Sequence, residues 1–124
     1  LKNRQYDEAI AHYRGQLEIE PGRGGFWTGL AAVYETLGDP GKALDVLMEG
    51  AEKAPGERDI FGHAFRVAAG MGRREEARGI VRKWLELHPG DEEFVAIERD
   101  FDRILAEEFG AAEFSDSAGG KEQQ

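Results

Sequence analysis

The sequence predicts an all-α fold, a superhelical array of antiparallel helix hairpins that ends in a C-terminal capping helix. Three observations predict it. Apolar residues recur every three or four positions, as on one face of an α-helix. No useful length of chain alternates apolar and polar residues, so no strands are expected. Alanines and prolines also recur at an interval of 34 residues, which is typical of stacked helical units: Ala9, Ala43, Ala77, Pro21, Pro55 and Pro89.

Residues 1–21 are expected to form the second half of a truncated repeat. An apolar stripe at helical spacing runs to Pro21, which ends the helix. We expect the first helix of this repeat to lie mostly before Leu1, which would leave part of the stripe uncovered. An exposed apolar patch of that kind often marks an interface. The stripe is therefore predicted to mediate self-association, most simply as a homodimer, through Tyr6, Ile10, Tyr13 and Leu17.

Residues 24–57 read as one complete helix hairpin. The first helix carries the stripe Phe26, Leu30, Val33 and Leu37, and the second carries Ala43, Leu44, Leu47 and Ala51. Between them lies the sequence LGDP. Gly38 suits a left-handed helix end, Asp39 an N-cap and Pro40 the first helical turn.

Residues 58–91 repeat the pattern in divergent form. Phe61 occupies the position of Trp27, while Ala68 replaces Tyr34. Two bulky residues, Phe65 and Trp84, stand at positions where we expect small ones. Exchanges that conserve total core volume are tolerated. We therefore interpret this divergence as repacking of a terminal repeat rather than as a cofactor site.

Residues 92–109 are predicted to form one capping helix, with an apolar stripe that includes Phe94, Phe101 and Leu105. Solenoids need such a cap, one face of which covers the last repeat while the other meets water. The alternative interpretation is a detachable helix that docks into a partner, and we favour the cap. Residues 110–124 are rich in Gly, Ser and charge and are expected to be a disordered tail.

Composition argues against several function classes. The net charge is −9, and residues 91–124 account for −8 of it with 11 acids and 3 bases. A nucleic-acid surface needs a basic stripe instead. There is no cysteine, serine occurs only at Ser115 and Ser117, and no H-E-x-x-H motif is present. We therefore expect no enzymatic activity, no metal, no cofactor and no nucleic-acid partner. No apolar run approaches the roughly 18 residues of a membrane span.

One basic stretch, RREEARGIVRK at residues 73–83, permits two interpretations. It is either a solvated helix face whose charges pair with neighbours or an anion-binding patch. We favour the solvated face.

The complete copy resembles a tetratricopeptide repeat, whose pattern runs W-x2-L-G-x2-Y, then A-x3-F, then P. Trp27, Leu30 and Tyr34 match the first helix, and Ala31 stands in for the usual glycine. Ala43, Leu47 and Pro55 match the second helix. The resemblance covers residues 1–91.

The resemblance implies a groove lined by the first helices that receives a peptide or a partner helix. When the groove positions of the family pattern are transferred to the matching positions of this sequence, the groove residues would be Thr28, Ala32, Glu35, Asp59, Gly62, Arg66 and Ala69. His63 lies near the same face, either as a ligand contact or as an ordinary half-buried histidine. Members that clamp a terminal carboxylate use several Lys, Asn and Arg side chains. In this set only Arg66 is a long cation, which argues against such a clamp.

The resemblance therefore implies a protein–protein interaction module with a protein or peptide partner. Two alternatives stay open. The chain could be a structural module that oligomerises through its helices, or a regulatory accessory domain of a larger enzyme.

Overall fold

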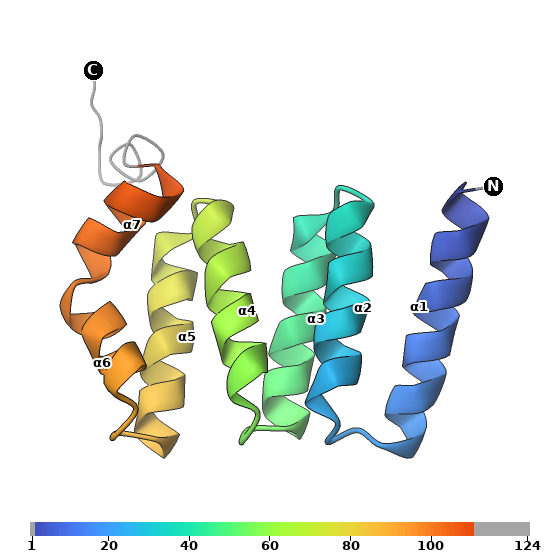
Figure 1. Ribbon diagram of the computed structural model, residues 1–124, viewed down its shortest axis with the longest axis horizontal. Coiled ribbons are helices and arrows are strands. Elements are labelled where there is room, and N and C mark those ends of the chain that lie inside the picture. The colour runs from blue at the N-terminus through green and yellow to red at the C-terminus, as the bar shows by residue number, and fades with distance from the viewer. Residues whose placement is uncertain (1, 111–124) are drawn as a thin grey trace. The chain divides into compact units, whose positions relative to one another are not determined.

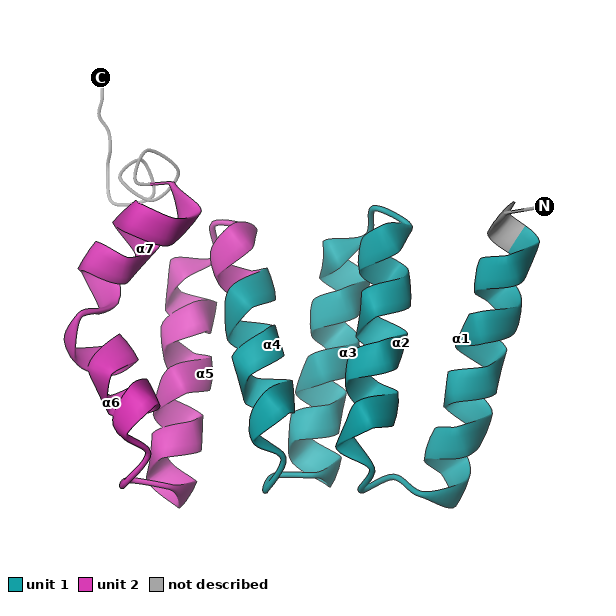
Figure 2. Ribbon diagram, viewed as in Figure 1, with its two compact units in different colours: residues 1–67 teal, residues 68–124 magenta. Residues whose placement is uncertain are grey.

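The computed structural model describes residues 2–110, with backbone alone for residues 2 and 3. In this range every regular element is a helix, and the all-α repeat architecture is confirmed. The chain divides into two compact units, Leu1–Val67 and Ala68–Gln124, with the division inside one helix (Figure 2). Residues 111–124, the expected tail, lie outside the described residues.

The first unit contains α1 (Lys2–Ile19), α2 (Gly24–Thr36), α3 (Pro40–Lys53) and most of α4 (Arg58–Gly70) (Figure 1). Helix α2 packs against both α1 and α3. Trp27, Leu30 and Ala31 of α2 are buried, and so are the four stripe residues predicted in α3. Leu37 differs from its prediction, because it follows the last residue of α2 and is 38% exposed.

The turn between α2 and α3 forms as the sequence predicts. Gly38 has φ +79°, a conformation that favours glycine. The Asp39 carboxylate accepts a hydrogen bond of 3.0 Å from the Lys42 backbone N–H, so it caps α3, and Pro40 occupies the first turn.

Two helical glycines allow close approach of neighbouring helices. A Cβ atom at Gly50 of α3 would lie 2.7 Å from Trp27 Cγ in α2. A Cβ atom at Gly29 of α2 would lie 2.6 Å from Tyr13 Cζ in α1. Trp27 is fixed in this position, because it is buried and its indole N–H donates to the Pro21 carbonyl oxygen at 2.8 Å. Gly50 thus allows α3 to pack closely against α2.

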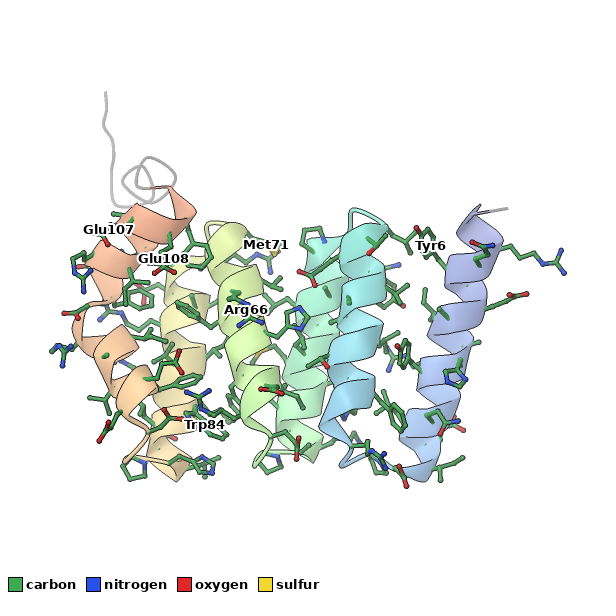
Figure 3. The ribbon with its side chains drawn as sticks, viewed as in Figure 1. Tyr6, Arg66, Met71, Trp84, Glu107 and Glu108 are labelled. Atoms are coloured by element: carbon green, nitrogen blue, oxygen red, sulfur yellow. The ribbon has the colours of Figure 1, made fainter. Side chains whose placement is uncertain are left out.

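The second unit contains the end of α4 together with α5 (Arg74–Leu87), α6 (Glu92–Arg99) and α7 (Phe101–Phe109). Trp84 of α5, labelled in Figure 3, is buried. Its ring stacks on His88 at a centroid distance of 3.7 Å, and its N–H donates to Asp91 at 2.8 Å. Asp91 also accepts a bond from the Phe94 backbone N–H and so begins α6. Trp84 is therefore a core residue that holds the start of α6.

The single capping helix predicted over residues 92–109 is wrong in one respect, because the chain breaks at Asp100 into α6 and α7. Asp100 has φ −105° and ψ 27°, outside helical geometry. Its carboxylate accepts hydrogen bonds from Arg99 and Arg103. Both Phe94 and Phe101 are buried on either side of the break, so the bend lets each short helix bury its own aromatic residue.

The basic stretch on α5 pairs with acids of the last two helices. Arg74 and Arg78 both contact the Asp102 carboxylate, and Arg82 donates to Glu98 at 2.8 Å. The Arg78 guanidinium also lies 4.4 Å from the centroid of the Phe101 ring, a cation–π contact. These contacts support the interpretation of this stretch as a helix face whose charges are paired.

Candidate functional site

An open pocket of about 260 Å³ lies between helices α2 and α4 within the first unit. We call it the α2–α4 groove. Thr28 comes from α2, and the other lining residues come from the first three turns of α4. They are Arg58, Asp59, Gly62, His63 and Arg66. On an α-helix, residues 58, 62 and 66 share one face because they lie four apart.

A polar contact joins the two helices beside this cavity. His63 Nε2 on α4 lies 2.7 Å from Glu35 Oε1 on α2. The His63 side chain is 15% exposed, whereas that of Glu35 is 39% exposed. Glu35 is therefore engaged, and His63 acts as a half-buried cross-link between the two walls.

Gly62 makes room for a charged side chain. A Cβ atom built at Gly62 would lie 3.6 Å from the Arg66 guanidinium nitrogen Nη1, an ordinary contact distance. The Arg66 side chain thus extends back along α4 over Gly62. Figure 3 shows Arg66 midway along α4, and its side chain is exposed.

The groove carries charges of both signs. Asp59 and Arg66 are exposed, and neither has a hydrogen-bond or ion-pair partner within the described part of the chain. Arg58 has an interaction of its own. The Thr28 hydroxyl donates to carbonyl oxygens of its own helix, Gly25 at 3.3 Å and Gly24 at 3.4 Å. Asp59 and Arg66 are consequently the two charged groups of the groove that can pair with a ligand without first breaking a contact to a described residue.

The structure brings most of the predicted groove residues together. Ala32 is exposed on α2, outside the residues that line the cavity. Ala69 requires a correction, because it is fully buried and offers no surface to a ligand. Sequence reasoning missed Arg58, although its four-residue spacing from Gly62 could have placed it on the same face.

The stripe predicted for self-association lies on the α2 side of α1. Leu17 is 6% exposed, and the Tyr13 ring lies 6.5 Å from that of Phe26 in α2. Tyr6, labelled in Figure 3, and Ile10 are half-buried. Tyr13 is half-buried as well, so these three residues of the stripe retain exposed area for another copy. Self-association through the stripe stays a prediction.

A larger cavity, of about 370 Å³, lies where α1, α2 and α3 meet. Its lining includes Leu17 and Trp27, both buried, and the Trp27 N–H is already bonded to Pro21. An ion pair of 3.3 Å between Arg14 and Glu49, which also line it, joins α1 to α3. Glu18 and Lys53 also line it, are exposed and have no hydrogen-bond or ion-pair partner in the described part of the chain, so this cavity offers as many uncommitted charged groups as the α2–α4 groove.

Residues 2–110 contain neither a candidate metal site nor a helix that could span a membrane. No group of three or more His, Cys, Asp or Glu side chains could hold a metal ion there. None of the described helices has the length and apolar character to cross a membrane.

Comparison with known proteins gives one positive finding. A family model described as tetratricopeptide repeat matches residues 1–62, which is half of the chain. These residues include α1, α2, α3 and the first turn of α4. No curated protein matches the sequence.

Proposed function

Because the chain belongs to the tetratricopeptide-repeat family, we propose that it is an interaction module that binds a peptide segment of a partner protein in the α2–α4 groove. Repeats of this family generally mediate protein–protein interaction and generally serve as non-enzymatic scaffolds. The proposal for this chain adds a location and a kind of ligand.

The observation that carries the proposal is the lining of the groove. Binding sites combine a concave surface with a few polar groups that fix orientation. The α2–α4 groove is such a cavity, with the exposed Asp59 and Arg66 on one wall and Thr28 on the other. The His63–Glu35 contact joins the walls, and a wall that is already ordered loses less entropy when a ligand binds.

Filling the groove tests the proposal. Gly62→Leu would place an apolar side chain at the cavity, where a Cβ atom already meets Arg66 at 3.6 Å. Gly79→Leu is the matched control, because Gly79 is an exposed position of α5 with open space around its Cα. Both changes replace a helical glycine with a better helix former, so neither is expected to lower stability.

Peptides selected on the wild-type chain from a random display library serve as ligands. We expect Gly62→Leu to weaken their binding at least tenfold and Gly79→Leu to leave it unchanged. Thermal melts of both variants check that each is folded. Equal binding by the wild type and a folded Gly62→Leu variant would contradict a ligand site in this groove.

A further inference from the structure

The side chain of Glu57 lies directly against the first turn of α2. A Cβ atom added at Gly24, the first residue of α2, would lie 3.0 Å from Glu57 Cδ and 3.1 Å from Glu57 Cγ, and closer still to Glu57 Oε1. Gly24 is buried, and the Glu57 carboxylate occupies the space where a side chain at position 24 would begin. Glycine at position 24 therefore permits this contact.

The first turn of α2 lacks an acidic group of its own. It contains neither Asp nor Glu, and Arg23 at the N-cap makes no capping hydrogen bond with its side chain. The N-terminus of a helix carries the positive end of the helix dipole, which favours a carboxylate nearby. Glu57, in the turn between α3 and α4, thus supplies the negative charge that the start of α2 lacks.

The backbone of Glu57 is fixed to the start of α4. Its carbonyl oxygen accepts a hydrogen bond of 3.2 Å from the Ile60 N–H in the first turn of α4. Its own N–H donates to the Ala54 carbonyl oxygen at 3.1 Å. Glu57 therefore belongs to one wall of the groove by its backbone and contacts the other wall by its side chain.

Groove residues adjoin this contact on both walls. Arg58 and Asp59 directly follow Glu57 in the sequence, and both line the groove. Thr28 on the opposite wall lies one turn after Gly24, to whose carbonyl oxygen its hydroxyl donates. Glu57 is not among the lining residues, so it acts on a ligand of the groove through the two walls.

We propose that Glu57 is a positioning residue of the α2–α4 groove, whose carboxylate fixes the beginning of α2 relative to the beginning of α4. The contact between His63 and Glu35 joins the walls further along both helices, so the walls are held at two levels. A site that is already ordered loses less entropy when a ligand binds. This inference rests on the proposed function, since it names a residue that supports the same groove without touching the ligand.

Two neighbouring glycines provide matched variants. Gly24→Ala would displace the Glu57 carboxylate, which can swing aside because it is the end of a flexible side chain. Gly25→Ala adds the same methyl group one residue further along α2, at an exposed position where it meets open space. Glu57→Ala removes the carboxylate directly. Glu52→Ala is its control, because Glu52 is an exposed acidic residue of α3.

Binding of peptides that are selected on the wild type and lost on Gly62→Leu gives the first readout. We expect Gly24→Ala and Glu57→Ala each to weaken this binding by about two- to fivefold, the range in which a charge at a helix terminus acts. The double variant should bind as weakly as either single variant, because both changes remove the same contact. Gly25→Ala and Glu52→Ala should bind as the wild type does. Losses that add in the double variant would overturn the inference.

Thermal melts test the contact itself, independently of any ligand. Alanine is a better helix former than glycine, so Gly25→Ala should raise Tm equally in the wild type and in Glu57→Ala. Gly24→Ala should be more favourable in Glu57→Ala than in the wild type, where it displaces the carboxylate. An effect of Gly24→Ala on Tm that is the same with and without the Glu57 side chain would overturn the inference.

Failure of the inference is distinguishable from failure of the proposed function. Peptides that lose binding on Gly62→Leu but bind Gly24→Ala as tightly as Gly25→Ala would overturn the inference and leave the groove as the binding site. Peptides that bind Gly62→Leu as well as the wild type would contradict the proposed function, and the role of Glu57 in the groove with it.

Discussion

The same substitution, glycine to alanine, should have opposite effects on stability at two helical positions of the first unit. At Gly50 the added Cβ would lie 2.7 Å from Trp27 Cγ and 3.0 Å from Trp27 Cβ. Real Cβ atoms essentially never come this close to a neighbour, so Trp27 or the helix must shift. At Gly62 the nearest atom is Arg66 Nη1 at 3.6 Å, and nothing needs to move.

The magnitudes follow from two opposing contributions. Alanine is favoured over glycine inside a helix by about 1 kcal/mol. Forcing an extra carbon into a packed core costs about 1–3 kcal/mol, and the Trp27 side chain cannot yield easily because it is buried and bonded to Pro21. We expect Gly50→Ala to lower the free energy of unfolding by up to about 2 kcal/mol and Gly62→Ala to raise it by about 1 kcal/mol.

Thermal melts followed by far-ultraviolet circular dichroism measure the difference. For a chain of this size 1 kcal/mol corresponds to about 4 °C in Tm. The two variants should therefore differ by about 4–12 °C, with Gly50→Ala the less stable of the two. A Gly50→Ala variant as stable as Gly62→Ala would refute the close contact between α2 and α3 on which this reasoning depends.

The other predictions concern the last two helices and α1. Phe101→Ala should lower the free energy of unfolding by about 3–5 kcal/mol, because Phe101 is 1% exposed. Val95→Ala, at a 40% exposed position, should change it by less than about 0.5 kcal/mol. Equal melting temperatures for the two variants would contradict the burial of α7. Hydrogen bonds from Arg99 lower the pKa of the Asp100 carboxyl from its ordinary value of 3.8. The stabilisation by this ionised carboxylate is thus present above about pH 4 and is lost below it, so the Tm advantage of the wild type over Asp100→Asn should disappear in acid; an advantage that persists at low pH would contradict this origin. Self-association through Tyr6 and Ile10 predicts a sedimentation coefficient that rises with concentration and an Ile10→Glu variant that stays monomeric; a strict monomer at high concentration would contradict it.

The helices were predictable because the spacing of apolar residues along the chain indicates them directly. The 34-residue period and the apolar stripes place every helix of the two later hairpins, and the residues between α2 and α3 act through their own backbone preferences. Each of these features depends on residues that are near one another in the sequence or one repeat apart.

The break at Asp100 was not predictable in the same way. Arg99, Asp100 and Arg103 have spacings that a continuous helix also accommodates. The bend depends on where Phe94 and Phe101 are buried, which is a property of the packed unit rather than of the segment.

The groove was predictable in outline and less so in detail. Family phase located Thr28, Gly62 and Arg66, but it counted Ala69 as a surface residue although the chain buries it. The position of a residue in the repeat gives its angle around the helix axis, but it does not determine which neighbouring helix covers the side chain. The contact between His63 and Glu35 joins side chains 28 residues apart, an interval that differs from the 34-residue repeat.

Mapping a bound peptide by NMR tests most directly whether the α2–α4 groove is the binding site. A peptide selected on the wild type is titrated into isotope-labelled protein, and the amide chemical shifts are followed. We predict that the largest changes occur at Thr28, Gly62 and Arg66 and are absent in Gly62→Leu. Changes confined to α1 or α7, with α2 and α4 unaffected, would contradict the proposed site.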